Sequence, residues 1–324
     1  MDFTALRYFF EAARTGSIRQ AAEHIHVAPS AISRQIAKLE HELDAQLFER
    51  RSSGVKLTAA GELLARQLES TVRDIYRVRA QIDDLKGLRR GDVTIYTIEG
   101  LVDAVVSLSI AKFSFQYPEI HFQVDVASTD RIIEAIVAGE ADIGIALNAP
   151  RRADVSVCFG WQEPLHAIVA PSHALSGRKS ISLQELTRYP ATLPDRTFGV
   201  RRQIDAMLKK TDLQPKMLVI TNSILTTVCV ARQGAAYTLM PMFAVERDIK
   251  AGTLLAIPLT DDDLEPSSAE ICVHRNRRLS LAAREFLSWL ENNIPKGGLQ
   301  GPVELAGIKA QRDRGRNHGR RRAL

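Results

Sequence analysis

The chain has 324 residues, of which 45% are hydrophobic and 25% charged, which excludes a fibrous or wholly disordered protein and leaves room for two or three globular domains. Its 43 Lys and Arg exceed its 38 Asp and Glu, which gives a net charge of +5. Residues 295–324 alone hold eight basic and two acidic residues, so the rest of the chain has a net charge of −1. Overall basicity is therefore weak support for nucleic-acid binding, and only the local arrangement of charges bears on it.

The N-terminal residues have the pattern of short helices that pack closely on one another. The first helix is indicated by apolar residues at helical spacing, which are Leu6, Phe9, Phe10 and Ala13. Gly16 is suited to end this helix, and Ser17 with Gln20 forms a capping box that starts the next one. The small side chains of Ala21 and Ala22 allow a further helix to cross closely above.

That further helix has Pro29 in its first turn and carries two contrasting faces. A buried stripe is predicted at Ile32, Ile36, Leu39 and Leu43. The opposite face has short polar groups and long cations, at Ser30, Ser33, Arg34, Ala37 and Lys38. Most of them lie in the first half of the helix, where a recognition helix contacts base edges in the major groove of DNA.

A basic hairpin is predicted next. Apolar residues in segments 47–49 and 55–57 flank Arg50, Arg51 and a Ser-Ser-Gly turn, which indicates two short strands and a wing that contacts DNA phosphate. The alternative interpretation of this region is a small helical core with a solvated basic face.

Signature residues recur through these first sixty positions. They are Phe9-Phe10, Gly16-Ser17, Ala21-Ala22, residues 33–36, Leu39-Glu40, residues 47–50 and Leu57-Thr58-x-x-Gly61. In this arrangement the segment resembles the N-terminal winged helix-turn-helix of the LysR-type transcriptional regulators. The resemblance implies a homo-oligomer, a dimer or tetramer, that binds an inverted-repeat operator in double-stranded DNA. The residues expected to contact DNA are Ser30, Ser33, Arg34, Gln35, Lys38, Arg50 and Arg51.

Two positions depart from the family pattern. The recognition helix starts with Ala28-Pro29-Ser30 where the family usually has Ser-Gln-Pro, so Ala28 cannot cap the helix with a side-chain oxygen, at a cost of about 1 kcal/mol. Specificity is then expected to depend on Ser30, Ser33, Arg34 and Gln35. Asp44 stands where the family has Gly and tolerates the left-handed backbone conformation better than most residues.

A long helical pattern runs from Thr58 to about Lys86 and contains an apolar heptad repeat. The dimerisation residues predicted on this repeat are Leu68, Ile75, Val78, Ile82 and Leu85. The simplest partner for such a stripe is the same helix of a second subunit. Packing on the core of its own chain is the alternative.

After Gly91 apolar runs alternate with helical segments, which favours an α/β fold with a parallel sheet. Strands are predicted at residues 92–97, 121–126 and 142–147, with helices at 131–138 and through Leu101, Val105, Leu108 and Phe113. The segments FSFQYPEIHFQV and IVAGEADIGIAL resemble parts of the LysR-type effector domain, which is similar to periplasmic binding proteins. That resemblance implies two lobes, with the chain crossing near Glu163 and returning near Ser267.

The resulting domain organisation has four parts. They are a winged helix-turn-helix DNA-binding domain (1–60), a linker dimerisation helix (61–88), an effector-binding domain (91–294) and a basic disordered tail (295–324). Lobe I is expected to comprise 91–162 and 268–294, and lobe II 163–267.

The effector is expected to bind between the lobes, where strand ends followed by helix N-termini present N–H groups that suit an anionic small molecule. The candidate effector-binding residues are Thr97, Thr129, Arg201 and Asn222. Glu99 opposes an anion if it points inward, which leaves the charge of the ligand open. Replacing Thr129 by Val is expected to change folding little, because the two side chains have nearly the same volume.

No catalytic motif, cofactor-binding motif or metal-ligand spacing is recognised, so we expect binding rather than turnover, with no cofactor and no metal. The three cysteines, Cys158, Cys229 and Cys272, are far apart and fit buried thiols in a reducing compartment better than a redox pair. With no signal-peptide pattern and no apolar run of about 18 residues, the chain is expected to be cytoplasmic. The alternative function is a solute-binding or enzymatic α/β domain with a fused basic head.

The heptad repeat generates a prediction about assembly. Replacing Ile75 and Ile82 together by Asp places charges in the apolar seam, so the dimer is expected to dissociate while the effector domain stays folded. Sedimentation velocity and circular dichroism measure the two properties. A doubly substituted protein that remains dimeric contradicts the assignment of the seam to the linker helix.

Overall fold

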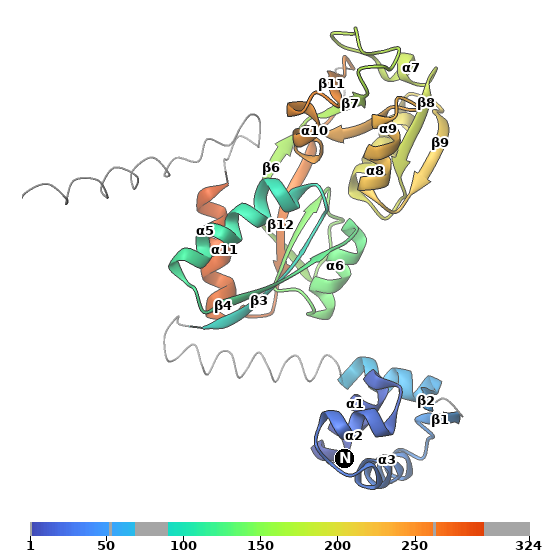
Figure 1. Ribbon diagram of the computed structural model, residues 1–324, viewed down its shortest axis with the longest axis vertical. Coiled ribbons are helices and arrows are strands. Elements are labelled where there is room, and N and C mark those ends of the chain that lie inside the picture. Colours follow the sequence, from blue (N-terminus) through green and yellow to red (C-terminus); the bar gives the residue numbers. More distant parts are fainter. Residues whose placement is uncertain (1, 52–53, 69–89, 262–263, 295–324) are drawn as a thin grey trace, which may run out of the picture.

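The structure, a computed structural model, describes residues 2–51, 54–68, 90–261 and 264–294 (Figure 1). Outside the described residues lie the tail 295–324 and the heptad positions Ile75, Val78, Ile82 and Leu85, and nothing of the side chains of Arg50 and Arg51 is described. None of the helices within the described ranges has the length and hydropathy needed to cross a membrane.

Three helices and a hairpin form the N-terminal domain. They are α1 (Phe3–Thr15), α2 (Ile18–His24), α3 (Pro29–Leu43), β1 (Phe48–Arg51) and β2 (Gly54–Leu57), and residues 59–68 are again helical. Gly16 follows α1 with a φ of 64°, and the Ser17 hydroxyl oxygen accepts from the Gln20 N–H at the start of α2, as predicted. The strands β1 and β2 pair antiparallel, which confirms the predicted hairpin.

The core of this domain is built mainly from α1 and α3. Phe9 is fully buried and its ring lies 5.1 Å from that of Phe48, measured between centroids. Of the four residues predicted to form the buried face of α3, three are buried. The fourth, Leu43, is 37% exposed, so the prediction was wrong for this residue. Leu43 is the last residue of α3, where the chain turns away through Asp44 at a φ of 48°. Leu68 is buried in the same core.

Lobe I of the effector domain is a five-stranded sheet with helices on both faces. The strands, in the order β4-β3-β5-β12-β6, are β4 (Ile120–Val126), β3 (Gly91–Thr97), β5 (Ile143–Leu147), β12 (Ser267–His274) and β6 (Val155–Glu163). The first three are parallel, as predicted, whereas β12 runs antiparallel to both its neighbours. The helices are η1 (Val102–Ser107), α5 (Leu108–Gln116), α6 (Thr129–Ala138) and α11 (Leu281–Asn293). Figure 1 shows α5 and α11 on one face and α6 on the other.

The first helical segment of lobe I differs from the prediction. Leu101, Val105 and Phe113 are buried, but Leu108 is only half-buried. The reason is that residues 102–107 form a π-helix, whose wider turn rotates later residues away from the face that an α-helix gives them.

The helix α6 lies very close to the sheet because β5 has a glycine beneath it. A Cβ at Gly144 would lie 2.5 Å from the Cδ1 of Ile136 and 2.8 Å from the Cγ2 of Ile132. Both isoleucines are buried. This packing holds the N-terminus of α6 at the carboxyl end of β5, the edge at which open α/β sheets bind ligands.

Lobe II contains two small sheets and short helices. One sheet has the order β10-β7-β11, and the other pairs β8 with β9 in parallel. These strands are β7 (Leu165–Val169), β8 (Pro190–Pro194), β9 (Lys216–Thr221), β10 (Thr238–Pro241) and β11 (Leu255–Pro258). The helices are α7 (Leu183–Leu186), α8 (Gly199–Lys210), α9 (Ile224–Arg232), η2 (Met242–Ala244) and α10 (Glu246–Lys250).

The chain passes between the lobes at one place. The strand β6 ends at Glu163 and β12 begins at Ser267, and these two residues are register partners. The Trp161 Nε1–H donates to the Glu163 carboxylate at 2.9 Å, and both side chains are buried. The two crossing strands are thus one hydrogen-bonded ribbon.

The start of α3 generates a stability prediction. Ala28 occupies the N-cap with extended backbone and no side-chain cap, so Ala28→Ser is expected to stabilise α3 by about 1 kcal/mol. Amide hydrogen exchange of α3 in the full chain is the measurement, with about fivefold slower exchange expected. Ser17→Ala, which removes the existing cap of α2, is the matched control and is expected to have the opposite sign in α2. Unchanged exchange in α3 contradicts the prediction.

Candidate nucleic-acid interface and interlobe cleft

The exposed face of α3 carries most of the residues expected to contact DNA. Ser30, Arg34 and Lys38 are exposed, and Ser33 is half-buried. Among the described residues neither Arg34 nor Lys38 has an ion-pair partner, so both cations are available to a nucleic acid. Gln35 is half-buried, and its Oε1 is buried with no hydrogen-bond partner in the described part of the chain, so this oxygen is not exposed to a bound nucleic acid.

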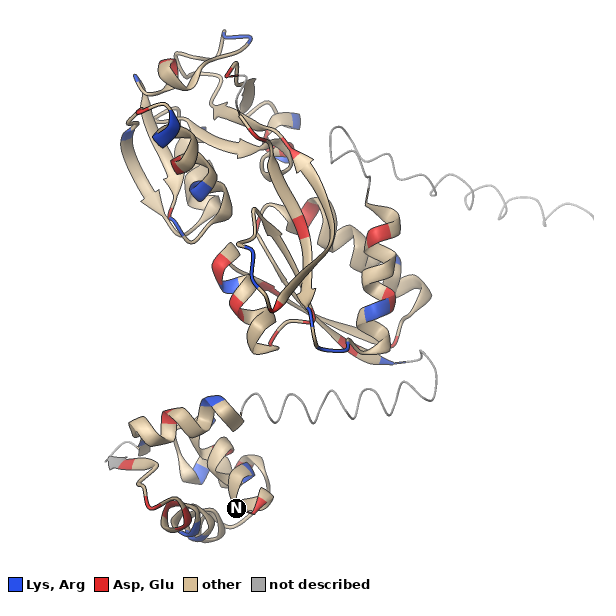
Figure 2. Cartoon of the chain, turned by 180° about the vertical axis from the view of Figure 1, so that it is seen from behind, with Lys and Arg blue, Asp and Glu red and all other residues tan. Residues whose placement is uncertain are grey.

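Basic and acidic groups are mixed on this domain. Figure 2 shows Lys and Arg positions interspersed with Asp and Glu positions along its helices. Several cations are already paired, such as Arg14 with Glu11 and Arg19 with Glu23. Arg34 and Lys38 therefore differ from these cations in having no ion-pair partner among the described residues, and the net charge of the domain does not distinguish them.

The hairpin is fastened to the turn between α1 and α2. The Val55 N–H donates to the Gly16 carbonyl at 3.0 Å. Gly54 has a φ of 133°, and a Cβ there would lie 2.4 Å from the same carbonyl oxygen. Only glycine permits this approach, which fixes β1 and β2 relative to the helices.

A small cavity lies between the two lobes. Its volume is about 30 Å³ and its lining is almost entirely apolar. Lobe I contributes Ile98, Gly100, Thr129 and Leu147, and lobe II contributes residues 198–200, Ile224 and residues 240–244 except Met242. Such a space holds about two water molecules and no metabolite, so the lobes are closed on each other.

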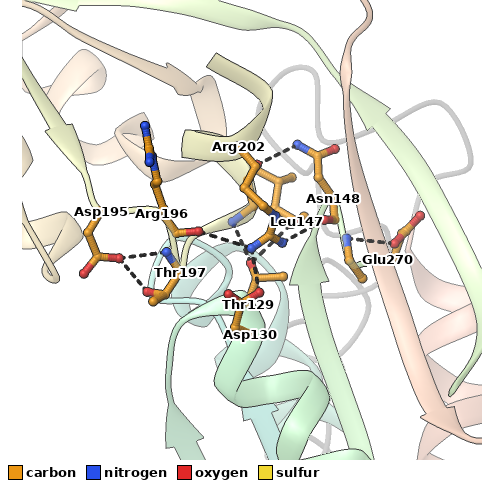
Figure 3. A network of polar contacts seen from close by, with 11 residues as sticks. Thr129, Asp130, Leu147, Asn148, Asp195, Arg196, Thr197, Arg202 and Glu270 are labelled. Carbon is orange, nitrogen blue, oxygen red and sulfur yellow. Dashed lines mark hydrogen bonds and ion pairs between the residues drawn. The ribbon is translucent and has the colours of Figure 1, made fainter. Parts of the chain in front are cut away.

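The lobes touch at a buried threonine. The Thr129 hydroxyl donates to the Leu147 carbonyl at 3.2 Å and accepts from the Gly199 N–H at 3.0 Å (Figure 3). Thr129 is 1% exposed. A Cβ at Gly199 would lie 1.7 Å from the Leu147 carbonyl oxygen, so only glycine lets α8 approach lobe I this closely. The hydroxyl therefore bridges the lobes as they stand, which argues against the expectation that Thr129→Val leaves folding nearly unchanged.

An ion pair spans the cleft next to this threonine. The Arg202 guanidinium of α8 donates to the Asp130 carboxylate of α6 at 2.6 Å and to the Asn148 carbonyl at 3.3 Å (Figure 3). The Asp130 N–H in turn donates to the Thr197 carbonyl at 3.2 Å. Backbone and side-chain groups at the N-terminus of α6 are thus occupied by lobe II.

Asn148 joins the crossing strand to lobe II. Its carboxamide oxygen accepts from the Ser268 N–H at 2.7 Å, and its amide nitrogen donates to the Gln203 side chain at 2.8 Å. Its φ of 50° is unusual for a non-glycine residue and turns the chain at the end of β5. Gln203 also accepts from the Ser267 hydroxyl at 2.5 Å.

Of the four predicted effector residues, only Thr129 lines the cavity. Thr97 is fully buried and its hydroxyl donates to the Ile98 carbonyl at 3.3 Å. Asn222 is exposed. Arg201 is buried within lobe II, where it donates to Asp205 at 2.7 Å and to the Pro194 carbonyl at 2.8 Å.

Arg202 and Asp130 were missed in the sequence. A signal for Arg202 existed, because residues three apart share a helix face and Gly199, the first residue of α8, faces the cleft. The adjacent Arg201 instead shares its face with Asp205, four residues on. To predict which of Arg201 and Arg202 faces the cleft, one must know the residue at which α8 begins.

The cysteines and histidines provide no reactive centre within the described ranges. No group of three His, Cys, Asp or Glu residues there is placed to hold a metal ion. Cys158, Cys229 and Cys272 are free thiols, but only Cys272 is buried, whereas Cys229 is half-buried and Cys158 is exposed, so the expectation of buried thiols was right for Cys272 alone. Burial raises the pKa of Cys158 and raises that of Cys272 to about 12, so both remain protonated near neutral pH, which favours the interpretation as ordinary thiols.

Two family models match the chain. One, described as a bacterial regulatory helix-turn-helix protein of the lysR family, covers residues 3–62, and the other, the LysR substrate binding domain, covers residues 86–294. The transcriptional regulator ClcR of Pseudomonas putida is 30% identical over 306 residues, spanning 90% of this chain and 98% of that protein. The dual regulator GltC of Bacillus subtilis (strain 168) is 29% identical over 293 residues, spanning 90% and 96%.

Solved structures share the fold. Full-length CbnR complexed with its target DNA is similar with a TM-score of 0.67 at 19% identity, covering 90% of this chain and 99% of that one. Full-length OxyR from Pseudomonas aeruginosa has a TM-score of 0.67 at 21% identity, covering 90% and 94%. The chain therefore belongs to the LysR family and is a LysR-type transcriptional regulator, with an N-terminal helix-turn-helix DNA-binding domain followed by an effector-binding domain.

Proposed function

We propose that the chain reads an inverted-repeat operator through α3 and the β1–β2 wing, and that a small molecule bound between the lobes modulates operator binding or DNA bending. The observation that carries this proposal is the pair of exposed cations on α3, Arg34 and Lys38, which have no ion-pair partner in the part of the chain that the structure describes. The proposed DNA contacts are Ser30, Ser33, Arg34, Gln35, Lys38, Arg50 and Arg51. The solved complex of CbnR with its target DNA supports the use of this domain for DNA.

The proposed domain boundaries assign one function to each segment of the chain. They are 1–60 for DNA binding, 61–88 for dimerisation, 91–294 for effector binding and 295–324 for a basic tail. The crossing at Glu163 and Ser267 supports a division of the effector domain near residues 162 and 268.

For the dimer seam we propose Ile75, Val78, Ile82 and Leu85. Leu68 was expected to belong to the seam, but its side chain is 6% exposed within the core of its own N-terminal domain. A residue already buried in one subunit contributes little to an interface, so the seam is proposed to start beyond it.

For the effector, Thr129 is the one predicted residue whose position supports a role in the cleft, and Asp130, Arg202 and Asn148 surround it. The regulator is proposed to act in the cytoplasm and to bind its effector without converting it. Operator binding that responds to a ligand, without turnover of that ligand, separates this function from an enzymatic α/β domain with a basic head.

The exposed face of α3 generates a prediction about sequence reading. Arg34→Ala is expected to lower the affinity for an operator selected from a duplex library by about 1–3 kcal/mol, because a base-edge contact is lost, and to leave random duplex affinity nearly unchanged. Fluorescence anisotropy titrations on both duplexes measure this. Arg19→Ala, which removes a paired cation of α2, is the control.

For the arginines of the wing we expect a different result in the same titrations. Arg50→Ala and Arg51→Ala are expected to weaken binding to both duplexes alike and to make the salt dependence shallower by about one unit of slope, because a phosphate contact is lost. An equal loss on both duplexes for Arg34→Ala assigns that residue to phosphate as well and contradicts its proposed role.

The lobe contact generates a prediction about folding. Thr129→Val leaves the Gly199 N–H and the Leu147 carbonyl without their partner in a buried position, so the effector domain is expected to lose about 1–3 kcal/mol of stability. Calorimetry of the full chain gives the shift in Tm. Thr129→Ser keeps the hydroxyl and is expected to retain most of the stability. A Val variant as stable as the parent protein removes the structural role of this hydroxyl.

A further inference from the structure

Charges are segregated across the rim of the interlobe cavity. Besides the contacts of neutral groups described above, three contacts of a carboxylate side chain join the lobes within the described residues, and in each the carboxylate belongs to lobe I and the donor to lobe II. The contacts are Asp130 with Arg202, Glu99 with the Leu225 N–H, and Asp103 with Arg247. Contacts of neutral groups run in both senses, since the Asp130 N–H of lobe I donates to the Thr197 carbonyl of lobe II, but the carboxylates of all three contacts belong to lobe I.

Two of the three contacts adjoin residues that line the apolar cavity. Asp130 follows Thr129, which lines the cavity, and its carboxylate lies 2.6 Å from the Arg202 guanidinium. Glu99 lies in the chain between two lining residues of lobe I, and its carboxylate accepts from the Leu225 N–H in the first turn of α9 at 3.3 Å. The positive end of the α9 dipole adds to this attraction.

The cavity is too small for a metabolite while these contacts persist. About 30 Å³ of space lies over an apolar surface that includes Ile98, Leu147, Phe198 and Phe243. A ligand of more than a few atoms must therefore separate the two walls. Separation breaks Asp130 from Arg202 and leaves a carboxylate facing the ligand from lobe I and a guanidinium facing it from lobe II.

A ligand that carries only one charge fits these walls poorly. A simple anion placed against Arg202 also meets the carboxylate of Asp130, and that of Glu99 beside the cavity adds to the repulsion that opposes it. A simple cation meets the guanidiniums of Arg202 and Arg247. A ligand with both charges replaces the contacts that its entry breaks, because each wall regains an oppositely charged partner.

We propose that the effector is a small zwitterion with an apolar body, the chemistry of a free α-amino acid. Its ammonium group binds Asp130 of lobe I, its carboxylate binds Arg202 of lobe II, and its apolar body contacts Ile98, Phe198 and Phe243. This ligand class rests on the proposed function, in which the cleft is the effector site. Asp130 and Arg202 are then the residues that determine specificity.

The test is a matched ligand panel on the full chain. Isothermal titration calorimetry is carried out with valine, leucine, methionine and phenylalanine, and with the deaminated acid and the decarboxylated amine of each. At least one amino acid is expected to bind, with both of its analogues weaker by about tenfold or more, since each lacks one charge-assisted contact. Analogues that bind as tightly as the amino acid overturn the ligand class, and so does a panel in which no amino acid binds.

Two substitutions assign the two charges. Asp130→Asn is expected to abolish the preference for the amino acid over its deaminated analogue and to keep the preference over the amine. Arg202→Gln is expected to do the reverse. Arg178→Gln, which removes an ion pair with Glu185 in lobe II away from the cleft, is the control and is expected to keep both preferences. Loss of both preferences in the control overturns the assignment, and the panel on the unsubstituted protein decides the ligand class even if a variant fails to fold.

Operator titrations separate this inference from the proposed function. An amino acid that binds and shifts operator affinity supports both. An anion that alone binds and shifts operator affinity overturns the zwitterion and leaves the regulatory function standing. An amino acid that binds without any effect on operator binding supports the ligand class and removes the regulatory role of the cleft.

Discussion

The antiparallel pairing of β6 with β12 is the constraint on which the effector domain depends. These two strands carry the chain out of lobe I and back again, and their register partners Glu163 and Ser267 lie where the lobes meet. Ladder hydrogen bonds resist sliding of one strand along the other, because a shift of one residue moves every side chain to the opposite face. The register therefore keeps the walls of the cleft opposite each other.

The closed cleft follows from one glycine and one hydroxyl. Gly199 lets the start of α8 lie against the Leu147 carbonyl, and Thr129 then joins the two with hydrogen bonds in both directions. Once the backbones are this close, the first turns of α6 and α8 face each other and bring Asp130 to Arg202. The polar groups at the starts of these helices thus form hydrogen bonds and an ion pair between the lobes. A ligand has to break these contacts in order to bind the same groups.

Much of the fold was predictable from local signals. Gly16, Ser17 and Pro29 punctuate the helices of the N-terminal domain as their chemistry predicts, and the parallel strands of lobe I coincide closely with apolar runs. The errors came where neighbours matter. Leu43 has helical spacing but lies at the open end of α3, and Leu108 leaves the buried face because the chain forms a π-helix before it. A prediction from apolar spacing assumes that the helix is a regular α-helix and that another element packs on it along its whole length. The sequence of the helix itself shows neither.

The sequence by itself determined the family, the order of the domains and the polar face of α3, because these depend on residue types at fixed short spacings. Only the tertiary structure decided which residues form the cleft. Arg201 and Arg202 are identical in chemistry, yet one is buried against Asp205 and the other reaches Asp130, 72 positions away in the chain. A difference of one residue rotates a side chain by about 100° around a helix, and which direction meets the other lobe is set by packing between segments distant in sequence.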